Sequence, residues 1–392
     1  MVRVLVIAPT IGFTGDVVNE RQVAMTIAQY SDTVFMIASL GISGIIKGLY
    51  RTFLNSRPSN MRILVIPFTQ LPFHRLWILN FVVRTFYALL LLVIAYFLDL
   101  RINFDVIYVR NPWFASFISF SNRLSRKCFV KIAAITEEHI YTSFMKRLAE
   151  MIICSIDRHV MKRVAGVVVH SIDFAKRLVL RRQILPKKIV VLPPGITGFN
   201  IDIVKRCCPR RKRDLKDKIV AGFLGYLERW QGVDILCDIV AELNRRGYRA
   251  RLKVIGDGPL RKYLVSRCVD VGVRVEITGF LPHHRALCLA RRDFDVLVLP
   301  QIRSETTSSI VPLKVVEALA LGIPVVVTDL PIYKRLEGKG LYTSKRTPKD
   351  FADTILKLLS NPRHCIDYEF LQKYFYEYNV SKFLKIPLRS KT

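Results

Sequence analysis

The sequence is poor in acidic residues. Its 392 residues include 31 Asp and Glu against 61 Lys and Arg, which gives a formal net charge of +30 at pH 7. Residues 1–200 hold 25 basic and 10 acidic side chains and residues 201–392 hold the other 36 and 21, so each half carries +15. This even spread excludes a detachable basic arm. Because net charge bears on association rather than fold, nucleic acid, an anionic bilayer and phosphorylated substrates all stay open as partners.

The eight cysteines include no C-x2-C pair, and the adjacent Cys207 and Cys208 have the wrong spacing for a zinc ribbon. We therefore expect neither a metal site nor a disulfide framework, and a reducing, cytosolic compartment fits better. The N-terminal apolar run Val4–Ala8 is short and is followed by Pro9, which favours a first strand over a signal peptide. Length and a hydrophobic content of 51% predict two folded domains, each with its own core.

Short β-branched runs alternate with longer helical patterns along the chain. Val2–Ala8 is typical of a buried strand, a loop with Gly12 and Gly15 follows, and 17–29 fits a helix. This alternation predicts parallel sheets with helices on both faces. The basic stretch 205–213 interrupts the pattern. We interpret it as a solvated interdomain linker, and the alternative is a nucleic-acid-binding or localisation patch. Further strands are expected at 33–38, 62–67, 106–110, 166–170, 188–193, 219–224, 250–255, 273–278, 296–300 and 324–328.

Residues 76–98 form an apolar segment in which only Asn80, Arg84 and Thr85 are polar. A membrane-spanning helix needs about 20 apolar residues, and Arg84 near the middle makes a simple span costly. The alternatives are a helical segment lying in the membrane interface and a core helix of the first domain. We favour membrane contact because the chain is also strongly basic.

A cluster of Ser and Thr residues precedes a predicted helix in the second half of the chain. Ser308 and Ser309 lie just before Pro312, a residue suited to the first turn of a helix. A helix N-terminus offers unpaired N–H groups and a positive dipole end, which together can bind phosphate. Lys314 adds a charge in that turn, and Glu317 is close enough to accept hydrogen bonds from a diol of the same ligand. Alternatively, the serines only cap the helix and Glu317 only faces solvent.

Taken together, these residues resemble the donor-sugar motif of family 4 retaining glycosyltransferases (glycosyl transferases group 1). The family has a Glu-x7-Glu pair before Ala-x-Ala-x-Gly-x-Pro-Val-Val, and Glu317 with Ala318–Val326 matches the second half. Four further segments match the family order across the second domain, namely Gly225–Asp234, Val254–Pro259, Thr278–Phe280 and Asp295–Pro300. The first domain matches more weakly, through its glycine loop and the segments 105–112, 167–171 and 188–195.

The resemblance implies an α/β protein of the GT-B fold, with two Rossmann-like domains facing each other across a cleft and a C-terminal segment returning to the first domain. The expected boundaries are 1–195 for the N-terminal acceptor-side domain, 196–365 for the C-terminal donor domain, and 366–392 for the returning segment. By the same resemblance, His139 is the candidate for a first-domain histidine near the transferred sugar, with a structural histidine as the alternative. His139, Glu317 and Lys314 are the expected catalytic residues. The expected donor-binding residues are Gly12, Gly15, Gly225, Arg229, Gly256, Gly258, Phe280, Ser308, Ser309 and Glu317.

Three positions depart from the family pattern. The first Glu of the pair, which binds the transferred sugar, is Ser309 here, and the Arg and Lys that bind the diphosphate are Tyr226 and Gln231. Arg229 and Lys314 are candidates to replace that charge. A Pro-x-Lys-x2-Glu variant without the first Glu also occurs in the family.

The family transfers a sugar from a nucleotide-diphosphate donor with retention, and the implied catalysis is stabilisation of charge on the departing diphosphate. We expect no metal or other cofactor, and the Asp293-Phe-Asp295 sequence leads straight into a predicted buried strand. The expected partners are a nucleotide sugar, a glycan or lipid-linked acceptor and anionic membrane at the cytoplasmic face, where the protein is peripheral or monotopic. Nucleic acid is not expected. The alternative is a catalytically degenerate GT-B protein that binds nucleotide or glycan within a membrane assembly.

Overall fold

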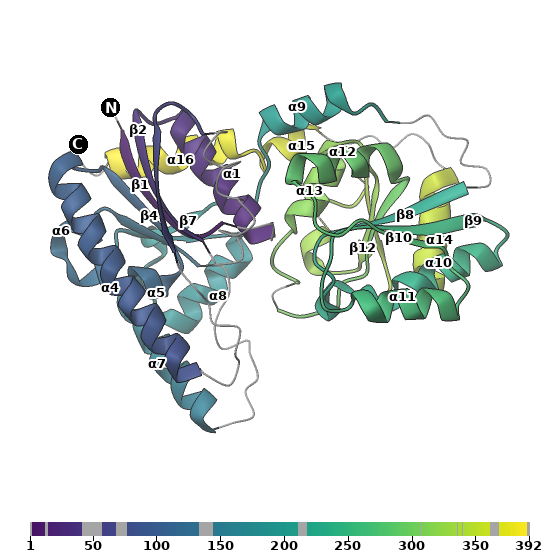
Figure 1. Cartoon of the computed structure of the whole chain (residues 1–392), viewed down its shortest axis with the longest axis horizontal. Coiled ribbons are helices and arrows are strands. Elements are labelled where there is room, and N and C mark those ends of the chain that lie inside the picture. The colour runs from purple at the N-terminus through teal and green to yellow at the C-terminus, as the bar shows by residue number, and fades with distance from the viewer. Residues whose placement is uncertain are drawn as a thin grey trace. The chain divides into compact units, whose positions relative to one another are not determined.

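The computed structural model divides the chain into two compact α/β units, each built on its own parallel sheet (Figure 1). The first unit comprises Met1–Gly12, Asn19–Pro193 and Tyr376–Thr392, and the second comprises Phe13–Val18 and Pro194–Phe375. The structure describes residues 2–11, 15–40, 57–67, 77–132, 144–210, 218–305, 307–334, 336–338, 340–360 and 368–389.

The first unit contains a seven-stranded sheet in the order β3-β2-β1-β4-β5-β6-β7, in which all neighbouring strands are parallel. The central strands consist mostly of fully buried Val, Ile and Leu residues, as expected for a sheet covered on both faces. The strands are β1 (Arg3–Ile11), β2 (Thr33–Leu40), β3 (Met61–Pro67), β4 (Val106–Arg110), β5 (Cys128–Lys131), β6 (Gly166–Val169) and β7 (Ile189–Val191).

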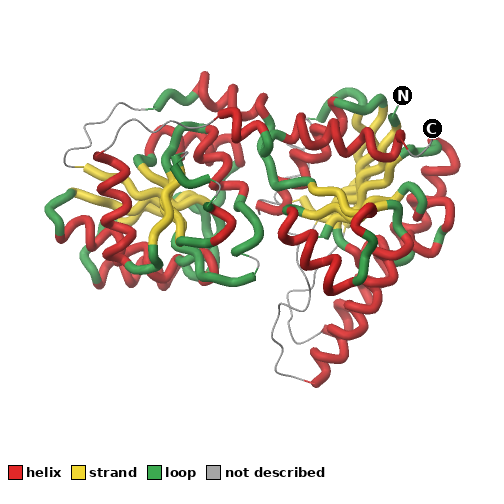
Figure 2. Tube along the Cα trace, turned by 180° about the vertical axis from the view of Figure 1, so that it is seen from behind, coloured by secondary structure: helices red, strands yellow, loops and turns green. Residues whose placement is uncertain are grey.

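Helices cover both faces of this sheet, as the two opposite views show (Figures 1 and 2). One core cluster joins α1 (Gly15–Gln29) and α16 (Tyr376–Arg389) to the sheet. A second cluster, on the other face, includes residues of five helices. These helices are α4 (Trp77–Ile102), α5 (Pro112–Ala115), α6 (Asn122–Ser125), α7 (Phe144–Arg163) and α8 (Ile172–Arg182).

The chain returns to the first unit at its C-terminal end, as the fold class predicts. Tyr376, the first residue of α16, is fully buried and its hydroxyl contacts Asn19 Oδ1 of α1. Phe383 packs edge-on against Phe129, with ring centroids 5.2 Å apart. The preceding helix α15 (Tyr368–Gln372) belongs to the second unit, where Leu371 joins the core and the Tyr374 carbonyl accepts a hydrogen bond from Ile196. The returning segment therefore begins at Tyr376 rather than at residue 366.

The second unit contains a six-stranded parallel sheet in the order β10-β9-β8-β11-β12-β13. From β8 the chain moves outward through β9 to β10, and from β11 it moves the other way through β12 to β13, so the order reverses between β8 and β11. Ligands of open α/β sheets bind outside the carboxyl ends of the strands at such a switch point. The strands are β8 (Lys218–Leu224), β9 (Arg249–Ile255), β10 (Val275–Ile277), β11 (Val296–Leu299), β12 (Val325–Thr328) and β13 (Leu341–Ser344).

One core cluster fills the second unit and includes residues from its helices as well as its strands. The helices alternate with the strands along the chain, which is the pattern that the sequence predicts. They are α9 (Gly198–Cys207), α10 (Leu236–Arg245), α11 (Arg261–Asp270), α12 (His283–Asp293), α13 (Leu313–Ala320) and α14 (Pro348–Ser360), in addition to α15. The sequence of strands and helices places α13 directly after the loop that follows β11, beside the switch point.

The expectation of no disulfides is wrong. Two disulfides lie in the second unit: Cys208–Cys288 joins the end of α9 to α12, and Cys237–Cys268 joins α10 to α11. The paired cysteines are 80 and 31 residues apart in sequence, so their proximity is created by helix packing and no local spacing reveals it. Of the cysteines that the structure describes, Cys128, Cys154 and Cys207 form no disulfide. Among the described residues, no group of three or more His, Cys, Asp or Glu side chains is placed to hold a metal ion.

Candidate functional site

The loops after β8, β9 and β10 meet at the carboxyl ends of these strands. Backbone hydrogen bonds connect them, from Gly225 N to Ile255 O and from Leu227 N to Asp257 O, both at 2.9 Å. An isolated bridge pairs Gly256 with Gly279. The structure thus brings together four predicted donor-binding positions, Gly225, Gly256, Gly258 and Phe280, at one edge of the second unit.

The glycines in these loops are required by close packing. Gly256 has a φ of 147°, and a Cβ there would collide with the Gly225 carbonyl oxygen. A Cβ on Gly258 would collide with the Leu227 backbone, and one on Gly225 would lie 2.6 Å from Lys314 Nζ. These glycines therefore let the loops approach one another and leave room for the lysine.

Lys314 lies in the first turn of α13 and extends to the loop after β8. Its ammonium nitrogen donates to Gln231 Oε1 and lies 4.7 Å from the centroid of the Phe223 ring. Burial lowers the pKa of Lys314 to about 7, although Glu317 acts in the opposite direction. Near neutral pH the lysine is therefore poised between its neutral and charged forms, and an arriving anion favours the charged form.

Glu317 lies one turn after Lys314 on the same face of α13 and is 3% exposed. Its Oε1 atom is 2.9 Å from Nε2 of His283, the first residue of α12. The alternative interpretation from the sequence, that Glu317 only faces solvent, is therefore wrong. His283 was not predicted from the sequence, because it is 34 positions from Glu317 and belongs to no motif of the resemblance.

The Ser/Thr cluster lies in a turn of its own, before α13 begins. The Ser309 hydroxyl donates to the Glu305 carbonyl at 2.5 Å, and Ser308 N donates to the Ser304 carbonyl at 3.0 Å. Pro312 is the N-cap of α13, and within the described part of the chain no side-chain capping hydrogen bond is formed there. The alternative that these serines cap the helix does not hold, and Pro312 lies just before the first turn rather than within it. Neither serine side chain therefore occupies the N–H groups at the start of α13.

Two exposed aromatic rings border these loops. Tyr226 and Phe280 stack with centroids 6.0 Å apart and an angle of 17° between the ring planes. They are 40% and 48% exposed, so together they present a flat apolar surface beside the glycine loops. Arg229 lies in the short 3-10 helix Arg229–Gln231 that follows Tyr226, and its side chain is exposed.

Of the three candidate residues in the first half of the chain, the structure describes only Gly15. Gly12 and His139 lie outside the described residues, and Gly15 is the first residue of α1. The D-x-D sequence serves the fold: Asp293 pairs with Lys253 at 2.9 Å and with Arg292, while Asp295 accepts a hydrogen bond from Val220 N at 2.7 Å.

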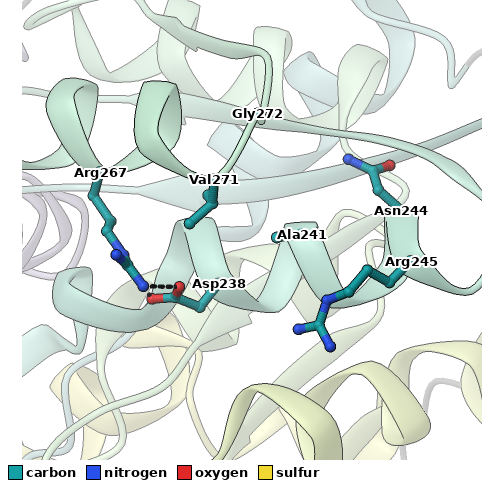
Figure 3. Close-up of a pocket in the computed structure, with 7 residues that line it drawn as sticks. All are labelled: Asp238, Ala241, Asn244, Arg245, Arg267, Val271 and Gly272. Carbon is teal, nitrogen blue, oxygen red and sulfur yellow. Dashed lines mark hydrogen bonds and ion pairs between the residues drawn. The ribbon is translucent and has the colours of Figure 1, made fainter.

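A cavity of about 600 Å³ lies between α10 and α11 (Figure 3). Asn244 and Arg245 precede β9, and Val271 precedes β10, so this cavity is at the amino ends of the strands, opposite the glycine loops. Arg267 and Asp238 point toward each other in it and form an ion pair at 2.6 Å. None of the predicted site residues lines it.

Two Rossmann-like units of this kind define the GT-B fold, and comparison with solved structures agrees. HepE of Anabaena, solved in complex with UDP and glucose, superposes with a TM-score of 0.66 at 16% identity over 98% of this chain and 100% of that one. WaaG, a glycosyltransferase involved in lipopolysaccharide biosynthesis, superposes with a TM-score of 0.62 at 14% identity over 99% and 98%. At such identities the likeness establishes the fold alone.

Sequence comparison adds a likeness to a named family for the second unit. Residues 218–361 match the model of the family described as Glycosyl transferases group 1. The alpha-D-kanosaminyltransferase of Streptomyces kanamyceticus is 26% identical over 231 residues, which cover 56% of this chain and 58% of that protein. The match thus spans little more than half of that curated relative. Together these findings support a glycosyltransferase of the GT-B fold.

Proposed function

We propose that this protein transfers a sugar, with retention at the anomeric carbon, from a nucleotide-diphosphate donor to a lipid-linked or membrane-proximal glycan acceptor. The observation that carries the proposal is the placement of Lys314 and Glu317 on one face of α13, at the switch point of a second unit that matches a glycosyltransferase family. The structural neighbour HepE, which binds UDP and glucose, supports a nucleotide-sugar donor.

The second unit offers the departing diphosphate three sources of positive potential. The uncapped N-terminus of α13 presents backbone N–H groups, Lys314 lies in its first turn, and the glycine loops bring further backbone amides nearby. Charge develops on the diphosphate as the sugar leaves, and groups already held in place stabilise that charge without reorganising. In this scheme Glu317 accepts hydrogen bonds from the ribose diol, and the Tyr226–Phe280 pair stacks on the base.

Lys314 takes the place of the two cations that the family pattern has at Tyr226 and Gln231. Because Gln231 accepts a hydrogen bond from Lys314, the substituted position holds the lysine in the site instead of supplying charge itself. At the third departure, Ser309 donates to Glu305, so a carboxylate for the transferred sugar has no counterpart there. This last difference motivates the alternative of a nucleotide-binding protein without turnover.

A thermal-shift screen tests the donor site. We expect at least one sugar nucleotide or nucleoside diphosphate of a uracil, guanine, adenine and thymine panel to raise the melting temperature, because a ligand bound only by the folded state stabilises it. Glu317→Ala should abolish the shift, whereas Glu369→Ala, which removes an exposed glutamate on α15, should retain it. No shift with any member of the panel would contradict the proposed donor site. A shift without turnover would favour the alternative.

The membrane part of the proposal rests on α4. By length and composition alone, Val82–Ile102 is apolar enough to cross a membrane, with a mean hydropathy of 1.9. One face of the helix contributes Tyr87, Leu91 and Ala95 to the core of the first unit, so the packed helix is not an isolated span. The opposite face is also apolar, and its exposed residues, 41–69% exposed, are Val82, Phe86, Leu89, Val93, Tyr96, Phe97 and Leu100.

Three cations lie near the carboxyl end of α4. Arg101 is exposed at the end of α4, and Arg123 and Lys127 both pair with Asp99, at 2.6 and 3.0 Å. An apolar helical face bordered by basic side chains fits the interface of an anionic bilayer. We accordingly place the protein as a peripheral or monotopic protein on the cytoplasmic face of a membrane. Its two disulfides are unusual for a reducing compartment. The number of free thiols in protein from acid-quenched cells therefore tests this location.

Flotation with liposomes tests the membrane surface. The wild-type protein should float with vesicles of phosphatidylcholine and phosphatidylglycerol, and Phe86→Gln with Phe97→Gln should lower the bound fraction at least about tenfold, since each change removes a large exposed apolar area that a bilayer would bury. Val269→Gln, which changes an exposed valine of the second unit, is the matched control and should bind as the wild type does. Wild-type protein that stays with the soluble fraction, without detergent, would show that this stripe does not bind lipid.

A further inference from the structure

The carboxylate of Glu317 lies close to an imidazole from another helix. His283 Nε2 is 2.9 Å from Glu317 Oε1, with the two side chains 23% and 4% exposed. The two atoms are within ion-pair distance, and among the described residues Oε1 accepts no hydrogen bond. Glu317 is therefore buried, and the short polar contact that its carboxylate makes comes from a different helix.

Burial of a carboxylate without partners costs free energy. A glutamate side chain also has three rotatable bonds, so it can turn away from a required position. Contact with the imidazole at the start of α12 restricts that freedom. With Oε1 next to His283 Nε2, the second oxygen of the carboxylate remains for a ligand. Because α12 follows directly after the loop of Phe280, the imidazole is attached to the same edge of the second unit as the proposed base surface.

We propose that His283 is a positioning residue: it orients Glu317 so that the carboxylate meets the ribose diol of the donor. The inference rests on the proposed function and adds a residue that no motif of the resemblance contains. His283 itself touches no substrate in this account. The neighbouring residue supplies a natural control, because His284 has the same side chain, lies on the same helix turn and is exposed.

The test compares ribose with 2′-deoxyribose in isothermal titration calorimetry. UDP, GDP and ADP are titrated into the full chain alongside their 2′-deoxy counterparts, using whichever base binds the wild type. His283→Ala should weaken binding of the ribonucleotide about tenfold and leave the deoxynucleotide within about twofold, since the lost interaction involves the diol. His283→Gln, whose amide nitrogen can replace Nε2, should restore most of the affinity, and His284→Ala should match the wild type.

The possible outcomes separate this inference from the function on which it rests. If the wild type binds none of the nucleotides, the proposed donor site is wrong. If the wild type binds but His283→Ala weakens both ligands equally, or neither, the positioning role is wrong and the donor site stands. Circular dichroism and melting temperature of each variant check the fold, and a folded His283→Gln protein keeps the comparison decisive where the alanine variant is unstable.

Discussion

Lys314→Met is expected to abolish the uptake of a proton on diphosphate binding and to lower kcat/KM by about two to three orders of magnitude. Burial places the pKa of Lys314 at about 7, so at pH 8 most of the unliganded protein carries a neutral lysine. A bound diphosphate stabilises the ammonium form, so binding draws a proton from solution and strengthens as the pH falls from 9 to 7. Calorimetry in Tris and in HEPES, which differ in ionisation enthalpy, measures the number of protons taken up.

Lys334→Met is the control for this prediction, because Lys334 is an exposed lysine of the same unit. It should leave both proton uptake and activity unchanged. Equal heats in the two buffers for wild-type protein at pH 8, once corrected for concentration, would mean that Lys314 does not change its protonation state on binding. In that case the positive charge of the site would have to come from elsewhere.

Glu20→Ala should lower the free energy of unfolding of the first unit by about 3–5 kcal/mol. Glu20 is 2% exposed and accepts hydrogen bonds from Lys131 Nζ at 2.6 Å and from the Tyr108 hydroxyl at 2.9 Å, with Arg110 Nε at 3.8 Å. Lys131 is 1% exposed, so removal of Glu20 leaves a buried ammonium group without its carboxylate. Urea unfolding followed by hydrogen exchange of β5 and β6 measures the loss within this unit.

The double variant Glu20→Ala with Lys131→Met is the matched control. It removes both charges, and it should recover most of the stability. Replacing both members of a buried ion pair by apolar groups is often tolerated, whereas removing only one member leaves the other charge buried without a partner. Equal stability of the single and double variants would show that the stranded charge is not the cause of the loss.

Acid sensitivity gives an independent test of the same network. Burial alone raises the pKa of Glu20, but Lys131 and Arg110 outweigh it and hold the pKa below its usual value. Burial, followed by the charge of Lys131, lowers the pKa of His170 to about 3. Both groups bind protons more strongly in the unfolded chain, so the free energy of unfolding decreases as the pH is lowered. For His170 this decrease begins near pH 6.5 and reaches about 2 kcal/mol at pH 5. A stability that is unchanged between pH 7 and pH 5 would contradict this account.

Local sequence patterns predicted the fold because they reflect local physics. Short β-branched runs separated by helical segments require parallel strands with crossover helices, and the observed sheets contain strands at the expected positions. The spacing of Lys314 and Glu317 was likewise sufficient to place both on one helical face. Features that depend on a single helix or strand could therefore be predicted from the sequence.

Features that depend on packing between distant segments were not accessible. The pairing of Cys208 with Cys288 and the contact of His283 with Glu317 join residues 80 and 34 positions apart, and both arise only when α12 packs in place. The pKa of Lys314 is of the same kind, because it depends on burial against Phe223 and Gln231. The start of α13 was misjudged for a local reason, since Ser309 hydrogen-bonds to its own turn instead of the helix.

The most direct test of the central claim is a turnover measurement. Purified wild-type protein is incubated with the sugar nucleotide that stabilises it and with a membrane lipid extract, and release of nucleoside diphosphate is followed together with the anomeric configuration of the glycolipid product by NMR. We predict release that requires the extract, an anomeric configuration identical to that of the donor, and loss of both with Glu317→Ala. Release that is equal in the wild type and Glu317→Ala, or a product of inverted configuration, would contradict the account.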